Sequence, residues 1–265
     1  MNRALIAITL VFLWFQACSF YGIEESCETN PELCQQDSQA VCLAEGTFTE
    51  DVSRQESMAA AELLREAFAG NSDEKLVEFL DTWARRIGPV TCDLFEQKSE
   101  TVQEAYRLFR DYYDPFNLER YGDSEWGSDV YADYDYIVVQ KNAAAEIPGF
   151  GREDDEYFRP LVEFENAAVL YLTEEYEHII EEFLEESREQ LWERIEFLRT
   201  HMSIDPGHWD GWEIVTCPHV GWFEFQPGLQ SALVYFSILN EGGQSTLVKN
   251  GDTWELVESQ LTWIE

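Results

Sequence analysis

The fold class is decided by five short runs near the carboxyl end of the chain: WEIVTC (212–217), VGWFEF (220–225), SALVYFSIL (231–239), STLVK (245–249) and TWELVESQLTWI (253–264). They are rich in β-branched and aromatic residues, as strands are. Turn signals separate them at 226–228 (QPG), 241–243 (EGG) and 250–251 (NG), and such short connections pair neighbouring strands antiparallel. Residues 211–265 therefore predict a curved meander of four or five strands. The run 232–239 is apolar on both faces, which predicts a central strand covered on both sides.

The chain before the meander, residues 51–200, has mainly helical periodicity. Four helices are expected, which begin near Asp51, after the capping residue Ser72, at a capping box of Thr101 and Glu104, and at Glu174. The last should be one long helix that ends near Arg199. A strand is expected at 134–140 and irregular chain at 141–160. Residues 51–265 thus predict an α+β domain, with helices packed on a curved antiparallel sheet.

The amino terminus indicates export. Residues 1–17 contain one arginine and an uncharged run of twelve residues, Ala4 to Phe15, which is shorter than the roughly 20 residues of a membrane-spanning helix. This pattern is typical of a signal peptide. Residues 13–18 (LWFQAC) resemble the cleavage box of bacterial lipoproteins, which implies lipid attachment at Cys18. Cleavage after Ser19 is the alternative and would release a soluble secreted or periplasmic protein.

Residues 18–50 form a cysteine-containing extension, either a tether or a segment pinned by a disulfide. Without Cys18, five cysteines are left, enough for two bridges and one free thiol, and their spacing leaves the connectivity open. Cys27, Cys34 and Cys42 lack the Cys-x-x-Cys step of zinc sites. The six residues His201, Asp205, His208, Asp210, Cys217 and His219 also match no standard ligand spacing. We therefore expect no metal and no cofactor.

Charge and missing motifs exclude several function classes. The chain has 17 Lys and Arg against 53 Asp and Glu, a formal net charge of −36. A surface this negative repels phosphate backbones, so no nucleic-acid partner is expected. A Gly-rich phosphate loop, a G-x-S-x-G elbow and an H-E-x-x-H helix are all missing from the sequence.

Two resemblances add to this interpretation. The order of helices, strand, long helix and antiparallel meander resembles the NTF2-like cone, in which helices close one side of a bent sheet and leave a pocket. Three stretches, 79–83 (FLDTW), 121–131 (YGDSEWGSDVY) and 240–265, are similar to an uncharacterised family of bacterial envelope proteins. That resemblance implies an envelope location and an NTF2-like carboxy-terminal region, and it implies no reaction.

The candidate pocket residues lie on the predicted sheet. His219, Glu224 and Tyr235 are candidates for acid–base chemistry, because an apolar pocket raises the pKa of a carboxylate such as Glu224 toward neutrality. Trp212 and Trp222 are candidate pocket walls.

Three functions follow as hypotheses. The leading one is an exported, lipid-anchored envelope protein that binds a small ligand or a protein partner without catalysis. The first alternative is an exported enzyme with a pocket acid or base. The second is an acidic inhibitor or immunity-like partner of a basic protein, drawn to it by charge.

Overall fold

The computed structural model describes residues 41–43, 54–122, 134–203 and 218–264. These residues belong to the second of two compact units, Met1–Ala40 and Val41–Glu265. Their helices and mostly antiparallel sheet confirm the predicted α+β class.

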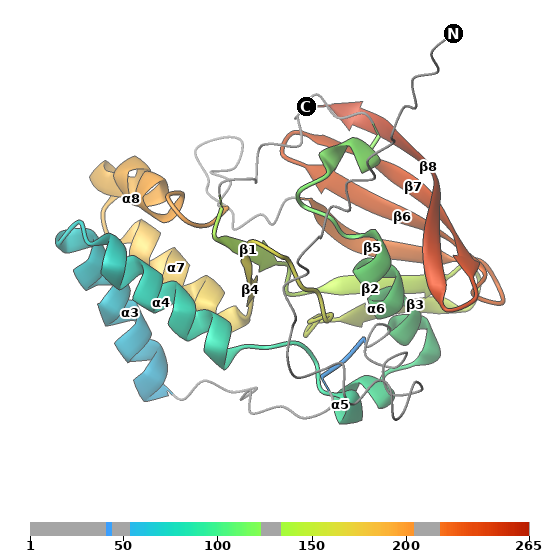
Figure 1. Cartoon of the computed structure of the whole chain (residues 1–265), viewed down its shortest axis with the longest axis horizontal. Coiled ribbons are helices and arrows are strands. Elements are labelled where there is room, and N and C mark those ends of the chain that lie inside the picture. Colours follow the sequence, from blue (N-terminus) through green and yellow to red (C-terminus); the bar gives the residue numbers. More distant parts are fainter. Residues whose placement is uncertain (1–40, 44–53, 123–133, 204–217, 265) are drawn as a thin grey trace, which may run out of the picture. The chain divides into compact units, whose positions relative to one another are not determined.

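The main element is a six-stranded sheet (Figure 1). In spatial order its strands are β3 (Gly151–Asp155), β2 (Ala143–Ile147), β5 (His219–Phe225), β6 (Ser231–Ile238), β7 (Glu241–Asn250) and β8 (Thr253–Ile264). Strands β5 to β8 form the predicted antiparallel meander. The hairpin β2–β3 corrects the expectation of irregular chain at 141–160, and β2 joins the meander by pairing parallel to β5.

One of the predicted turns is wrong. Asn250 and Gly251 connect β7 to β8, and Gly251 has the positive φ of 63° that favours glycine. The connection between β6 and β7 is made instead by Leu239 and Asn240. Gly242 and Gly243, expected in that turn, lie inside β7.

The two faces of this sheet differ in burial. Along β6, Ala232, Val234, Phe236 and Ile238 are buried, whereas the residues between them are half-buried. We call the buried side the inner face, and the side that carries Trp222, Glu224 and Tyr235 the outer face. Strand β6 is central as predicted, but the expectation that both of its faces are covered is wrong.

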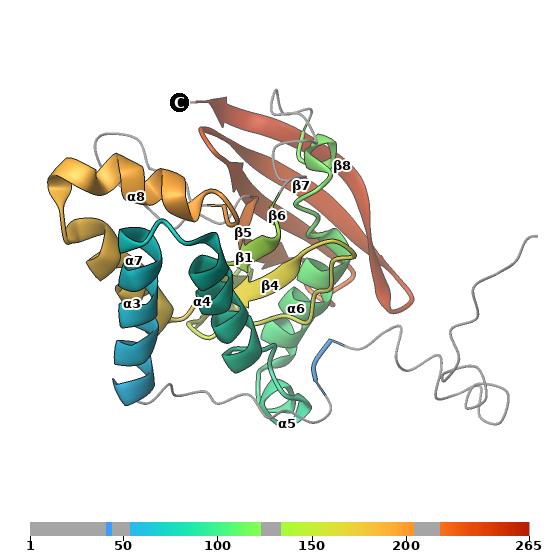
Figure 2. The ribbon, with the colours of Figure 1, turned by 60° about the vertical axis from the view of Figure 1, so that its left-hand side comes forward.

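Helix α6 (Glu100–Tyr112) packs on the inner face, which Figure 2 shows from the side. The ring of Phe158 lies 5.1 Å from that of Phe109 on α6 and 6.1 Å from that of Phe223 on β5. The helix begins after Ser99, whose side chain accepts a hydrogen bond from the Val102 N–H. The predicted capping box at Thr101 is therefore wrong.

Buried ion pairs fix α6 and its neighbours to the strands. Glu104 on α6 accepts hydrogen bonds from Lys249 on β7 (2.8 Å) and from the Trp254 indole on β8 (3.2 Å). At the other edge, Asp155 pairs with Lys98 (2.7 Å) and accepts a hydrogen bond from Tyr106 (2.9 Å). Both carboxylates are less than a tenth exposed, so they depend on these partners.

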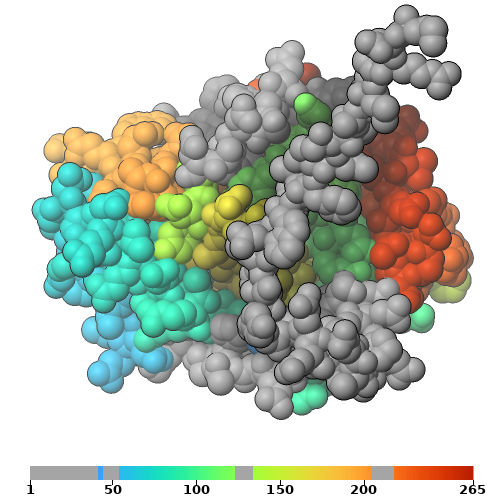
Figure 3. Space-filling model, in the orientation of Figure 1, coloured from blue at the N-terminus to red at the C-terminus, as the bar shows by residue number. Residues whose placement is uncertain are grey.

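A second group of elements packs beside the sheet (Figures 1 and 3). It contains the helices α3 (Arg54–Ala69), α4 (Asp73–Arg86), α7 (Glu174–Glu185) and α8 (Leu191–Leu198), and the parallel strands β1 (Tyr136–Val139) and β4 (Ala168–Tyr171). Trp83 on α4 stacks on Tyr176 at 4.5 Å and donates a hydrogen bond to the Tyr171 carbonyl. The expected single helix from Glu174 to Arg199 is interrupted after α7 by the short 3-10 helix Arg188–Gln190.

A disulfide joins Cys42 to Cys92 at the start of α5 (Cys92–Glu96). Two backbone hydrogen bonds extend the contact, from Leu43 to the Val90 carbonyl and from Cys92 to the Leu43 carbonyl. The expected extension is thus pinned near its end, and Cys42 is not a free thiolate for a metal. Among the described helices, none has the length and apolar composition that crossing a membrane requires.

Candidate functional site

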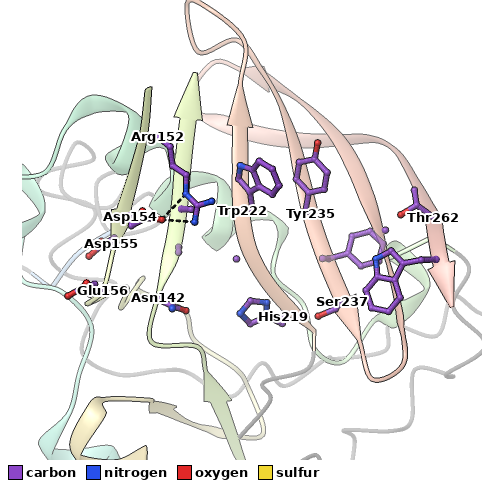
Figure 4. A pocket seen from close by; sticks show the side chains of 16 residues that line it. Asn142, Arg152, Asp154, Asp155, Glu156, His219, Trp222, Tyr235, Ser237 and Thr262 are labelled. Carbon is purple, nitrogen blue, oxygen red and sulfur yellow. Dashed lines mark hydrogen bonds and ion pairs between the residues drawn. The ribbon is translucent and has the colours of Figure 1, made fainter. Parts of the chain in front are cut away.

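A cavity of about 870 Å³ lies on the outer face of the six-stranded sheet (Figure 4). All six strands contribute to its lining, from Arg152 and Asp154 on β3 to Thr262 and Trp263 on β8. The sheet register sets the positions of the side chains. Because directly paired residues point to the same face, Ala144, Trp222 and Tyr235 form one row across the sheet.

A three-membered stack forms one wall of the cavity. The Trp222 and Tyr235 rings stack with centroids 4.5 Å apart, and the guanidinium of Arg152 lies 5.9 Å from the Trp222 ring. Asp154 holds that guanidinium by an ion pair of 2.7 Å and a hydrogen bond of 2.8 Å. Trp222 is paired on β2 with Ala144, whose side chain is small. This leaves space for the indole between Arg152 and Tyr235.

A second row contains His219, Ser237, Gly242 and Trp263, which are paired in that order from β5 to β8. The Trp263 indole crosses directly over Gly242, where an added Cβ would lie 2.1 Å from its Cζ2 atom. The His219 ring similarly lies over Gly221, where an added Cβ would lie 2.5 Å from Cε1. Each glycine is adjacent to a register shift in the sheet, so its missing side chain lets a ring lie against the strand.

The amide of Gln140 fixes the beginning of β5 beside the cavity. Its Nε2 donates a hydrogen bond of 2.7 Å to the Val220 carbonyl, and its Oε1 accepts one of 2.8 Å from the Val220 N–H. This side chain therefore pairs with β5 as a neighbouring strand would, and it stabilises the backbone between His219 and Gly221.

The charges in the lining are largely compensated. Arg152 neutralises Asp154, and Asp155 pairs with Lys98 behind the sheet. Burial lowers the pKa of His219 below its usual value, so its imidazole is neutral at pH 7. Glu156 is the remaining charged residue of the lining. Most of the charges in the lining are thus paired, whereas Glu146 and Glu224 lie on the same face outside the lining.

Three of the candidate pocket residues, His219, Trp222 and Tyr235, line this one cavity. Glu224 is on the outer face beside it but is not part of the lining. Burial, then the negative charges of Glu224 and Glu146, raise the pKa of Tyr235. Trp212 and the lipid-attachment candidate Cys18 lie outside the described residues.

Arg152, Asp154 and Trp263 were not among the predicted pocket residues. The first two lie on the hairpin that was expected to be irregular, and their place beside β5 depends on a parallel pairing between segments far apart in the chain. Trp263 was visible as a strand residue. Its partner Gly242 was the available signal, but the glycine pair had been assigned to a turn.

His201, considered in the sequence as part of a metal cluster, lies away from the cavity. Its Nδ1 is 2.8 Å from Asp135 and its Nε2 is 2.6 Å from Asp73, so both ring nitrogens are engaged by carboxylates. Asp205, His208, Asp210 and Cys217 lie outside the described residues. Over the described ranges, no group of three or more His, Cys, Asp or Glu side chains is arranged to hold a metal ion.

The surroundings of His219 bear on proton transfer in the cavity. A general base is usually oriented by a hydrogen bond from a second side chain. Within the described part of the chain, no hydrogen bond joins His219 to a carboxylate or a hydroxyl, and burial is the only cause of its pKa shift.

The comparisons with family models, with curated proteins and with solved structures give no match for this chain.

Proposed function

We propose that this protein is an exported, lipid-anchored envelope protein that binds a ligand, without catalysis, in the cavity on the outer face of its sheet. One observation carries the binding part. Trp222, Tyr235 and Trp263 line the same cavity on the open side of the sheet, and the two indole residues remain 36% and 43% exposed. Aromatic side chains left exposed around a cavity of this size, with a few polar groups among them, are typical of ligand sites.

Two features support export. The first is the pattern of residues 1–17 followed by Cys18. The second is the Cys42–Cys92 disulfide, because such bonds persist mainly in oxidising compartments outside the cytoplasm. A lipid anchor would also account for membrane attachment of a chain whose negative charge is repelled by anionic headgroups.

The NTF2-like cone is part of this proposal. Its support is the packing of α6 against the inner face of a twisted sheet made of a hairpin and an antiparallel meander (Figure 2). The cavity proposed for the ligand lies on the opposite, outer face.

Anchoring is tested by mass spectrometry of the mature amino terminus, purified from membranes. We expect the chain to begin at an acylated Cys18, and a Cys18→Ser variant should move to the soluble fraction. Cleavage after Ser19 would support the soluble alternative. Recovery of intact protein with Met1 attached would contradict export.

Binding is tested by ligand-observed NMR with a mixed set of probes that contains neutral sugars, aromatic amines, a fatty acid and oligolysine. We expect at least one class to bind the unmodified protein and to lose binding when Trp222 or Trp263 is replaced by alanine. Trp192→Ala is the matched control, because Trp192 on α8 is 59% exposed and does not line the cavity. If no probe is sensitive to the two cavity variants, the proposed site is wrong.

A further inference from the structure

The chemistry of the cavity also restricts the class of ligand. We infer that the outer-face cavity binds a neutral carbohydrate chain, with a pyranose ring packed on the indole of Trp263. This inference rests on the proposed function, because it names the ligand of the same site.

The position of Trp263 favours a flat ligand. Since its indole crosses over Gly242, one side of the ring is covered by β7, while 43% of the residue is still exposed. A flat aromatic surface lying on a sheet suits a flat ligand with apolar C–H groups on one side. A pyranose ring has such a side, and its hydroxyl groups point outward from the ring edge, where they can reach neighbouring polar side chains.

Uncharged polar groups line the cavity around the Trp263 indole. Ser237 is the cross-strand neighbour of Gly242, and Thr262 is adjacent to Trp263. His219 and Asn142 line the same cavity, and His219 is neutral because burial lowers its pKa. Uncharged groups that both donate and accept hydrogen bonds match hydroxyl groups, which do the same.

The charges around the Trp222 ring bear on the choice between a sugar and a cation. A cationic ligand is favoured by an aromatic site that has excess negative charge. Here the cation that lies over Trp222 is the protein's own Arg152, and Asp154 already compensates it. The ion pair of Asp155 with Lys98 removes a further negative charge from the site. Apart from Glu156, the charged groups that line the cavity are thus paired within the protein, and Glu146 and Glu224 lie on the same face outside the lining.

The size of the cavity and the span of its lining suit a chain of sugars. About 870 Å³ lies within the range of roughly 300–1,000 Å³ typical of small-molecule sites. The lining runs across all six strands, from Arg152 on β3 to Trp263 on β8. A short oligosaccharide would contact both aromatic groups, whereas a single sugar would contact one.

The inference is tested by isothermal titration calorimetry with cellohexaose, maltohexaose and hexa-N-acetylchitohexaose, each compared with its monosaccharide. We expect one hexasaccharide to bind more tightly than its monosaccharide, with little dependence on salt because neither partner site carries a large net charge. Trp263→Ala should weaken that binding by at least about ten-fold. Trp192→Ala should leave it unchanged.

A second variant tests whether the position of the Trp263 indole matters, in addition to its presence. Gly242→Ala keeps Trp263 but places a methyl group where the indole lies, so the ring must move off β7. We expect a loss of affinity comparable to that of Trp263→Ala, together with a shift of the tryptophan fluorescence and an unchanged far-UV circular dichroism spectrum. Unchanged sugar affinity in both variants would overturn the inference.

The failure of this inference is distinguishable from the failure of the proposed function. If hexalysine or an aromatic amine binds in a way that depends on Trp263 and no sugar does, the cavity is a ligand site and the carbohydrate assignment is wrong. If no probe depends on Trp222 or Trp263, both proposals are wrong.

Discussion

The glutamates on the two faces of the six-stranded sheet differ in their contacts. On the inner face, Glu104 is buried against Lys249 and Trp254 and helps to hold α6 to β7 and β8. On the outer face, Glu146 and Glu224 are direct neighbours on β2 and β5, and within the described residues neither takes part in a salt bridge. The same strands therefore use the inner face for stability and leave unfavourable contacts and exposed rings on the outer face. This difference between the faces agrees with the binding role proposed for the outer face.

Substitutions at two consecutive residues of β5 should show the largest difference between the faces in the free energy of unfolding. Phe223 is fully buried on the inner face, and its neighbour Trp222 is 36% exposed on the outer face. Phe223→Ala should lower the free energy of unfolding by roughly 4 kcal/mol, because it leaves a cavity in the core. Trp222→Ala should lower it by about 1 kcal/mol, since the main loss is the ring contact with Tyr235. Urea denaturation of both variants checks this, and equal effects would show that the outer face also contributes to the core.

The second largest effect is expected for the buried carboxylate of α6. Glu104→Ala leaves Lys249 buried without its partner and should lower the free energy of unfolding by about 3 kcal/mol. Glu258→Ala, on the outer side of β8, is the matched control and should stay within about 0.5 kcal/mol of the unmodified protein. A loss below about 1 kcal/mol for Glu104→Ala would mean that the pair is solvated.

A smaller effect of opposite sign is expected on the outer face. Glu224→Gln removes one of two facing negative charges and should raise the free energy of unfolding by roughly 0.2–1 kcal/mol at low salt. The gain should shrink as salt screens the remaining charges. Differential scanning calorimetry at two ionic strengths measures this. A destabilised variant would show that the hydrogen bond between Tyr235 and the Glu224 carboxylate outweighs the repulsion from Glu146.

The smallest effects on stability are expected from two histidines, His201 and His219, whose pKa values shift in opposite directions. Partial burial alone would lower the pKa of His201, but the hydrogen bonds and charges of Asp73 and Asp135 outweigh it and raise the pKa. Burial lowers the pKa of His219. Tyr136 faces His201 as well, and its hydroxyl donates to Asp81.

The sign of each contribution follows from proton linkage. His201 binds its proton more tightly when the protein is folded, so its contribution to stability is complete below the unfolded pKa of about 6.5 and is lost as pH rises through the folded pKa. His219 binds its proton less tightly when folded, so the protein loses stability as pH falls below about 6.5. Urea unfolding from about pH 5 to pH 8 should show that His201→Gln removes the first slope and His219→Gln the second. If the free energy of unfolding depends on pH in the same way for the unmodified protein and a variant, that histidine does not cause the slope assigned to it.

The sequence predicted the meander and the helices because their signals are local. The strand runs and the Asn250-Gly251 turn define β7 and β8 within a few residues, and Ser72 caps α4 by accepting a hydrogen bond from the Lys75 N–H, as expected. The features that sequence reasoning missed depend on distant contacts. The hairpin of β2 and β3 is rich in alanine and acidic residues, and it becomes part of the sheet only through β5.

The candidate site shows the same limit. His219, Trp222 and Tyr235 belong to the meander, so alternation alone brought them into consideration. Arg152 and Asp154 reach the cavity through the parallel pairing of β2 with β5, for which the sequence contains no local signal. Gly242 illustrates a different difficulty: a glycine pair after a strand usually indicates a turn, and only the ring that covers it shows otherwise.

The Cys42–Cys92 bond has a mechanical consequence. It links two points 50 residues apart, and α3 and α4 lie within the loop that it closes. A force applied to the chain ahead of Cys42 passes through the sulfur atoms to Cys92, so the backbone of both helices carries no tension. Stretching the protein from its amino end should therefore not extend the chain between Cys42 and Cys92 until the bond is reduced, after which about 50 additional residues can extend by up to roughly 3.3–3.6 Å each.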